Sequence, residues 1–358
     1  MRITISLPPT HARKSPWTGD TIRDGGVGVS GTESTFVLFA EHWARRGHDV
    51  RVVGRDCASG TARGVQYVSG GESPDDFGDP EVLLMPSWDE SCTRHAFPNL
   101  RTVLINFACA CALREQVDAF QGATKIGLFP SDWTRRTVHA QAPWMTEAMA
   151  ASHVIPNPLM TDTFVVAEDA ASKIPRSMVW HASWERGGDV AARAFQKAFG
   201  DEGGQFTVMD YFTPSGKGSA DRATVYRHLA AAEYFVYPLV LPSGQVTKDT
   251  FACCVAEALA HGVIVITWRV AAMPELYGDD TVQWIPTPDR AAFTNHEFPV
   301  YDTHFASERA VDDIAAIIAR LEADPAEKEA IRERGRRLAA TFGAATVCPL
   351  LDRVAPGL

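Results

Sequence analysis

The chain has 358 residues, of which 46% are hydrophobic and 22% charged, and 44 acidic residues outnumber 34 basic ones for a formal net charge of -10. This composition is typical of a globular protein and excludes a disordered one, and the length favours two domains. The acidic balance disfavours nucleic acid as a partner, although a local basic groove would still bind it.

The N-terminal run RITISL is too short for a signal peptide, and no stretch approaches the roughly 20 apolar residues of a membrane span. We therefore expect a cytoplasmic protein. The seven cysteines are scattered without zinc-ligand spacing, so we expect reduced thiols and no metal site. For Cys109 and Cys111, core packing is favoured over a redox or metal pair.

The first part of the chain alternates strands and helices. Strand patterns at 2–7, 49–53, 82–85, 102–105, 125–129 and 153–155 flank helix-like stretches, the first of them at 33–46. This order predicts a doubly wound parallel sheet over residues 1–156.

Residues 157–175 lose periodicity and read as a linker. A second alternation follows, with strands at 177–181, 206–209, 234–237 and 263–267 and helices at 189–199, 222–231 and 251–261. Residues 308–340 are helical and amphipathic. We thus expect a second α/β domain at 157–341, and a C-terminal helix within 342–358 that packs back across the domains.

Two segments have the character of anion sites, because helix N-termini at the carboxyl ends of strands present free N–H groups. The first is the glycine-rich loop at 25–33, capped by Ser30 or Thr32, for which a flexible surface loop is the alternative. In the second, at 241–267, we expect a helix to begin near Asp249 or Thr250, so that Glu257 lies about 12 Å further along it. Alternatively, Asp249 is only a cap and Glu257 only a buried polar residue.

The second segment resembles the donor site of retaining glycosyltransferases of family 4, which carry a Glu-x7-Glu motif followed by small residues, Gly and an apolar strand. Here it stands as Asp249-x7-Glu257, then AlaLeuAlaHisGly and VIVIT. Further blocks match in order: GlyThrGlu at 31–33, ArgGlyHisAspVal at 46–50, ProSerAsp at 130–132, ValIleProAsn at 154–157, GluArgGly at 185–187, TyrPro at 237–238 and MetProGluLeu at 273–276.

The resemblance implies a GT-B fold, with two Rossmann-like doubly wound domains facing across a cleft. It implies that the N-terminal domain, 1–156, binds the acceptor and the C-terminal domain, 157–341, the nucleotide-sugar. It implies transfer from a nucleoside diphosphate sugar, UDP- or GDP-linked, with retention, no metal and no other cofactor. Asp249 would contact the sugar and Glu257 the ribose, while Arg186 would neutralise the leaving phosphate. The other donor-side candidates are Gly31, Thr32, Ser183, Lys248, Thr250 and Phe251, the last two acting through their backbone.

The sequence departs from the family in three places. Asp249 replaces the usual Glu, and Asn106 stands where many relatives have a His near the sugar. The family's Arg before the Lys-Gly element has no counterpart, so His181 or Lys248 are its possible substitutes.

Two other functions remain open: a sugar-nucleotide-binding protein with weak catalysis, and a GT-B sugar-nucleotide epimerase. Modified DNA bases, protein side chains, lipids and small metabolites all remain possible acceptors. The stretch at 8–26 is either a mobile loop or part of an acceptor site.

Overall fold

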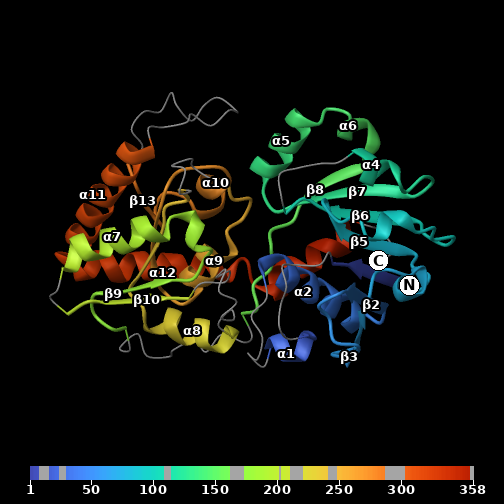
Figure 1. Ribbon diagram of the computed structural model, residues 1–358, viewed down its shortest axis with the longest axis horizontal. Coiled ribbons are helices and arrows are strands. Elements are labelled where there is room, and N and C mark those ends of the chain that lie inside the picture. Colours follow the sequence, from blue (N-terminus) through green and yellow to red (C-terminus); the bar gives the residue numbers. More distant parts are fainter. Residues whose placement is uncertain are drawn as a thin grey trace. The chain divides into compact units, whose positions relative to one another are not determined.

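A computed structural model describes residues 1–7, 16–23, 30–108, 114–161, 173–200, 203–209, 221–240, 248–286 and 303–354 of the chain. It divides into two compact units, residues 1–160 with 342–358 and residues 161–341 (Figure 1). Cys109 and Cys111, the glycines at 25–28 and most of the stretch at 8–26 lie outside the described residues.

Unit 1 is built on an eight-stranded sheet of order β3-β4-β2-β1-β5-β6-β7-β8. The pairs are parallel except β3–β4. The strands are β1 (Arg2–Ser6), β2 (Asp49–Gly54), β3 (Gly60–Ala62), β4 (Val65–Ser69), β5 (Val82–Pro86), β6 (Thr102–Asn106), β7 (Thr124–Phe129) and β8 (Ala151–Val154). The helices are α1 (Gly19–Arg23), α2 (Gly31–Arg45), α3 (Pro74–Phe77), α4 (Arg114–Asp118), α5 (Asp132–Gln141), α6 (Met145–Ala148) and α13 (Ala344–Val347).

Alternate residues of the central strands enter two separate cores. Leu84 of β5 belongs to one hydrophobic cluster, whereas its neighbours Leu83 and Met85 belong to the other. Because side chains on a strand point alternately to opposite faces, both faces of this sheet are covered. This is why the central strands read as continuous apolar runs.

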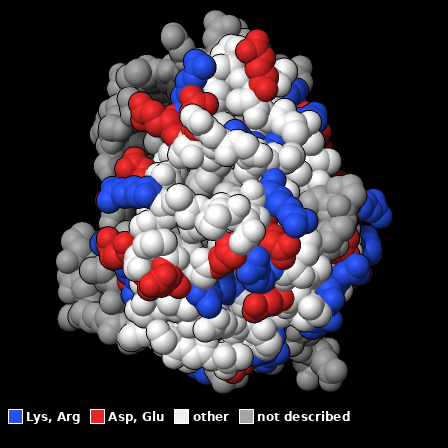
Figure 2. Space-filling view, turned by 90° about the vertical axis from the view of Figure 1, so that its right-hand side faces the viewer, with Lys and Arg blue, Asp and Glu red and all other residues white. Residues whose placement is uncertain are grey.

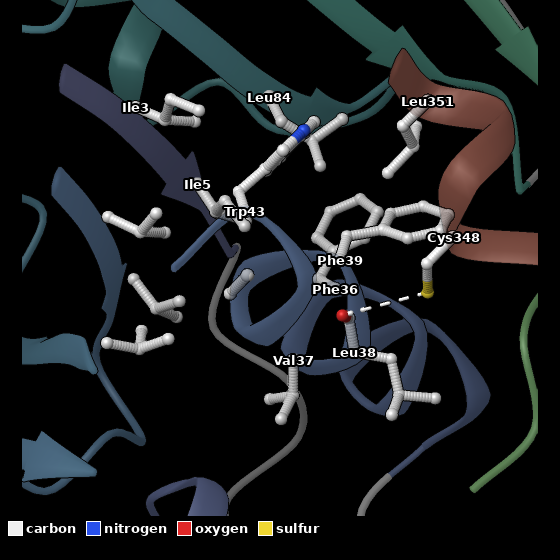
Figure 3. Packing of buried hydrophobic residues seen from close by; sticks show 14 of the residues in the cluster. Ile3, Ile5, Phe36, Val37, Leu38, Phe39, Trp43, Leu84, Cys348 and Leu351 are labelled. Atoms are coloured by element: carbon white, nitrogen blue, oxygen red, sulfur yellow. Dashed lines mark hydrogen bonds between the residues drawn. The ribbon is translucent and has the colours of Figure 1, made fainter. Parts of the chain in front are cut away.

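Helix α2 and the C-terminal segment share the first of these cores (Figure 3). Ser30 accepts a hydrogen bond from the backbone N–H of Glu33, whose carboxylate accepts one from the N–H of Ser30, so the helix begins with a capping box. Cys348 lies beside α2, with its thiol 3.7 Å from the carbonyl oxygen of Leu38. The helix expected within 342–358 is only the short α13, followed by a 3-10 helix at Cys348–Arg353.

Unit 2 has a five-stranded parallel sheet of order β10-β9-β11-β12-β13. Its strands are β9 (Ser177–Trp180), β10 (Gln205–Val208), β11 (Tyr234–Tyr237), β12 (Ile264–Thr267) and β13 (Gln283–Trp284). Its helices are α7 (Gly188–Phe199), α8 (Arg222–Ala231), α9 (Cys253–Ala260), α10 (Met273–Tyr277), α11 (Thr303–Glu322) and α12 (Pro325–Ala340). The run at 264–267 is fully buried, as an internal strand requires.

The predicted helical region at 308–340 consists of two helices. Pro325 occupies the first turn of α12 and the Asp324 carboxylate accepts a hydrogen bond from the N–H of Glu327. A proline tolerates the start of a helix but not its interior, so the chain breaks here. The short antiparallel strand β3, its partner β4 and β13 were not predicted from the sequence.

Lys173 ties two helix ends together in unit 2. Its ammonium group donates hydrogen bonds to the carbonyl oxygens of Leu229 (3.1 Å) and His261 (2.8 Å), at the C-terminal ends of α8 and α9. A cation there satisfies carbonyl groups that the helices leave without partners. Burial is nevertheless the main reason why the pKa of Lys173 is lowered to about 7.

Charged side chains of both signs are interspersed on the face shown in Figure 2, without a continuous basic area among the described residues there. No helix in the described ranges has the length and apolar character needed to cross a membrane. Within the same ranges, no group of three or more His, Cys, Asp and Glu side chains is placed to hold a metal ion.

Candidate functional site

The sheet of unit 2 changes its winding direction between β9 and β11. From β9 the chain moves outward to β10 on one side, then returns to β11 on the other side of β9. In open α/β sheets, ligands bind beyond the carboxyl ends of the strands at such a switch point. Arg186 follows β9 and Tyr237 ends β11, so both lie at this place.

Arg186, Tyr237 and Asp249 form one hydrogen-bonded cluster. Nη1 of Arg186 donates to the Tyr237 hydroxyl oxygen at 2.8 Å and to Oδ2 of Asp249 at 2.6 Å. The Tyr237 hydroxyl in turn donates to the same Asp249 oxygen at 3.0 Å. Burial, followed by the nearby Cys254 and Asp249, raises the pKa of Tyr237 well above its usual value, so the hydroxyl keeps its proton.

One end of the Arg186 guanidinium is thereby fixed while the rest stays available. Its side chain is 39% exposed, and Nε and Nη2 have no partner among the described residues. A guanidinium presents five N–H donors in a rigid fork that suits bidentate binding of phosphate or carboxylate. The arrangement is thus an oriented cation with donors left for an anion.

The backbone after Arg186 requires glycine. Gly187 has a φ of +109°, and a Cβ atom there would lie 2.4 Å from Cγ of Pro238, the residue after β11. Glycine therefore allows the turn that carries Arg186 to approach the end of β11 closely. Ser183 supports the same turn, because its carbonyl oxygen accepts a hydrogen bond from the N–H of Arg186 at 3.0 Å.

The segment after Asp249 differs from the prediction. Helix α9 begins at Cys253, not near Asp249 or Thr250, so the span from Asp249 to Glu257 is helical only in part. Oδ1 of Asp249 accepts hydrogen bonds from the N–H groups of Phe251 (3.1 Å) and Ala252 (2.6 Å). The Ala252 backbone is left-handed, with a φ of +53°, which delays the helix.

This local geometry changes what the backbone offers. The N–H group of Phe251, expected to face a diphosphate, is bonded to Asp249 instead. Asp249 is therefore a cap of its own loop as well as the partner of Arg186. Lys248 and Thr250 lie on either side of it in partly buried positions.

Glu257 is buried within α9 and faces two side chains of α8. The Tyr226 hydroxyl lies 3.3 Å from Oε1 of Glu257, and Nη2 of Arg222 lies 3.6 Å from the same atom. Burial raises the pKa of Glu257, and the Arg222 charge and the Tyr226 hydrogen bond oppose that rise. The buried Glu257 side chain therefore already has a hydroxyl donor and a cation as partners within unit 2.

His181 does not replace the cation missing from the family pattern. It is fully buried, and burial lowers its pKa to about 3, so the ring is neutral near pH 7. The prediction that His181 takes the place of the family's missing arginine is therefore wrong.

The three remaining predicted residues belong to unit 1. Gly31 and Thr32 form the first turn of α2, next to the buried carboxylate of Glu33, which reduces the attraction of this helix end for an anion. Asn106 ends β6, is 2% exposed, and its amide oxygen accepts a hydrogen bond from the N–H of Ala108 at 3.0 Å. Its side chain thus shapes the turn after the strand.

Neither a family model nor a curated protein matches the chain. Several solved structures do match it over nearly their whole length. Sucrose-phosphate synthase from Thermosynechococcus elongatus is 13% identical with a TM-score of 0.67, covering 98% of this chain and 97% of its own. WaaG, a glycosyltransferase involved in lipopolysaccharide biosynthesis, is 13% identical with a TM-score of 0.64, covering 99% and 100%.

HepE from Anabaena, solved in complex with UDP and glucose, is 12% identical with a TM-score of 0.63 over the whole of both chains. The fold is GT-B. At identities of 12–13% this likeness establishes the fold alone, so the chemistry of the chain must be argued from its own residues.

Three residues of this region have no predicted site role: Tyr237, which appears above only in the matching TyrPro block, Arg222 and Tyr226. The sequence around Tyr237 indicates a site residue, since a side chain with a hydroxyl group stands at the end of a strand, directly before Pro238. The sequence around Arg222 and Tyr226 gives no such indication, because they meet Glu257 only through packing of α8 beside α9, 31 or more residues away in the sequence.

Proposed function

We propose that the chain is a glycosyltransferase that moves a sugar from a nucleoside diphosphate sugar to an acceptor. The observation that carries this is the Arg186 guanidinium, anchored by Tyr237 and Asp249 at the switch point of unit 2 with donors left for a phosphate. The GT-B fold and the resemblance of residues 249–267 to the family 4 donor segment support it.

In this reaction Arg186 stabilises the leaving group. Cleavage of the bond between the sugar and the β-phosphate places negative charge on phosphate oxygens, and a fixed cation in a partly buried site stabilises that charge in the transition state. The anchor matters because Arg186 needs no reorganisation when the charge develops. The departing phosphate itself accepts the proton of the acceptor hydroxyl, so no separate base is needed.

The finer features rest on the resemblance to family 4. We infer retention at the anomeric carbon and catalysis without a metal, with Arg186 neutralising the leaving phosphate. Glu257 accepts hydrogen bonds from the ribose hydroxyls. UDP- and GDP-sugars are both candidate donors, and the UDP and glucose complex of HepE favours the former.

A sugar-nucleotide-binding protein with weak catalysis is the second candidate. The Asp249 carboxylate already accepts four hydrogen bonds, from Arg186, Tyr237, Phe251 and Ala252. A carboxylate has about four lone-pair positions. Contact with a sugar hydroxyl therefore requires that one of these donors is exchanged for the ligand.

The test is a panel of UDP- and GDP-sugars assayed for binding by titration calorimetry and for hydrolysis or transfer. For Arg186→Ala we expect turnover to fall by about 10²–10³, the cost of removing one transition-state donor. Arg193→Ala is the matched control, because Arg193 also makes ion pairs and its side chain is 40% exposed. Equal turnover in Arg186→Ala and Arg193→Ala would overturn the assignment, and donor binding without turnover in the wild type would favour the second candidate.

A further inference from the structure

The turn that carries Arg186 also carries an exposed indole. Trp184 begins the 3-10 helix Trp184–Arg186, two residues before the guanidinium, and is 36% exposed. A single exposed apolar residue is not in itself a sign of binding. Two further features distinguish this indole: the way in which its neighbours hold it, and the side of the sheet on which it lies.

A glycine seat holds the indole of Trp184 in place. A Cβ atom at Gly188, the first residue of α7, would lie 2.4 Å from Cε3 and 2.5 Å from Cδ2 of Trp184, so the ring lies directly over this glycine. The φ of Gly188 is not in the left-handed region, so glycine is needed here for space and not for its backbone conformation. The ring of the buried Trp180 also contacts the indole, with ring centroids 6.1 Å apart and an angle of 72° between the planes.

Trp184 and Glu257 lie on opposite sides of the unit 2 sheet. Because strand crossovers are right-handed and the winding reverses at β9, α7 covers one face of the sheet, and α8 and α9 cover the other. Figure 1 shows α7 and α8 on opposite sides of β9 and β10. Trp184 rests on the start of α7, whereas Glu257 of α9 faces α8. Arg186 bonds to Tyr237 at the end of β11, in the sheet layer between these two sides.

This arrangement gives a nucleoside diphosphate sugar a direction. With the diphosphate at Arg186 and the ribose at Glu257, as in the proposed function, the nucleoside end of the donor lies toward α8 and α9. The sugar at the other end of the diphosphate then lies toward α7 and Trp184. The C–H groups of a pyranose ring carry partial positive charge, which the negative face of an indole attracts, and the contact removes apolar surface of both from water.

We propose that Trp184 is a specificity-determining residue of the donor site, whose exposed indole packs against the C–H face of the transferred sugar. The proposal rests on the proposed function, because it takes the ligand of Arg186 to be a nucleoside diphosphate sugar. It adds a requirement that binding of the phosphates does not make. The site prefers a donor that carries its sugar over the bare nucleoside diphosphate, and the indole supplies this preference.

The test is titration calorimetry of the full chain with UDP-glucose, UDP-N-acetylglucosamine and GDP-mannose, each compared with its bare diphosphate, UDP or GDP. For the donor that the wild type binds most tightly, Trp184→Ala should raise the Kd about fivefold or more and leave the Kd of the bare diphosphate within about twofold. Trp184→Phe should keep most of the affinity, because it keeps an aromatic face. Arg186→Ala should weaken binding of both ligands. Trp284→Ala is the matched control, because Trp284 is also a partly buried tryptophan of unit 2 but lies on β13, at the sheet edge opposite to β10.

A double-mutant cycle tests the seat. Gly188→Ala displaces the indole, so it should lower the Tm and weaken nucleotide-sugar binding while sparing the bare diphosphate. When Gly188→Ala is combined with Trp184→Ala, the added methyl group has room. We therefore expect the double variant to match Trp184→Ala in Tm and in binding. Equal effects of Gly188→Ala with and without the indole would overturn the assignment of the seat.

Two results of the titrations would overturn the role of Trp184 and leave the proposed function standing. One is equal nucleotide-sugar binding by Trp184→Ala and the wild type. The other is equal weakening of the nucleotide-sugar and the bare diphosphate in Trp184→Ala, which would place the indole against the nucleoside. Absence of nucleotide-sugar binding by the wild type would instead overturn the proposed function, and the role of Trp184 with it.

Discussion

Removal of the Asp249 carboxylate separates its role in folding from any role in binding. In Asp249→Ala, the N–H groups of Phe251 and Ala252 and the buried Tyr237 hydroxyl lose their acceptor. Each unsatisfied buried group costs about 1–3 kcal/mol. Water reaches the 39% exposed Arg186 side chain and part of this loop, so we expect a loss of roughly 2–4 kcal/mol in the free energy of unfolding of unit 2, less than the sum.

Hydrogen exchange during urea titration measures this loss where it occurs, because two units need not unfold in one step. Faster exchange of the Phe251 and Ala252 amides is the specific signature. Asp249→Asn keeps an acceptor for both amides and should lose only about 1 kcal/mol. Asp249→Glu should behave like the alanine variant in the exchange of these amides, since short side chains are required to bond N–H groups two and three residues ahead. Unchanged exchange at Phe251 and Ala252 in Asp249→Ala would refute the capping role.

Two further predictions concern unit 2. Gly187→Ala should lower the free energy of unfolding by about 2 kcal/mol or more and reduce nucleotide-sugar binding, because strain at φ +109° adds to the clash with Pro238. Gly203→Ala has a positive φ of +84° but open space, so a thermal melt should show a smaller effect; equal losses would contradict the clash. The pKa of Lys173 is about 7 in the folded chain and near 10.5 in the unfolded chain. Between pH 7 and pH 10.5 the unfolded chain therefore binds more protons than the folded one, so the free energy of unfolding rises with pH in this range. Urea titrations at several pH values should show this rise in the wild type and a flatter profile in Lys173→Met, and parallel profiles would contradict it.

Much of the fold follows from periodicity in the sequence. The central strands of both sheets are apolar on both faces, and α2, α7 and α8 have clear apolar stripes or caps, so these elements were predictable. Strand β3 has three residues and β13 two, too few for a period to be visible. Pro325 indicates the break between α11 and α12, but the predicted helical region at 308–340 does not include this break.

The start of α9 was not predictable from local rules. Asp249 followed by Thr250 is typical of a helix N-terminus and predicts a helix from residue 250. Tertiary contacts instead keep the segment non-helical as far as Cys253, where α9 begins. Oδ1 of Asp249 accepts hydrogen bonds from the N–H groups of Phe251 (3.1 Å) and Ala252 (2.6 Å), the Tyr277 hydroxyl lies 2.5 Å from the carbonyl oxygen of Phe251, and the left-handed φ of +53° at Ala252 interrupts the helical backbone. Likewise, Arg186 and Asp249 lie 63 residues apart in the sequence, and only the order of β9 and β11 brings them to 2.6 Å.

Both units follow one topological rule. In each, the winding reverses beside the first strand, and polar residues gather at the carboxyl ends of the two strands that flank the reversal. In unit 2 this place holds the anchored guanidinium of Arg186 with donors left for an anion, whereas in unit 1 it holds a cavity of about 370 Å3, which Trp88 lines in part and in which carboxylates outnumber arginines. We therefore expect an anionic nucleoside diphosphate to bind at the Arg186 site of unit 2 and not at the cavity of unit 1. If Trp88→Ala weakened nucleotide-sugar binding as much as Arg186→Ala, this division by charge would be wrong.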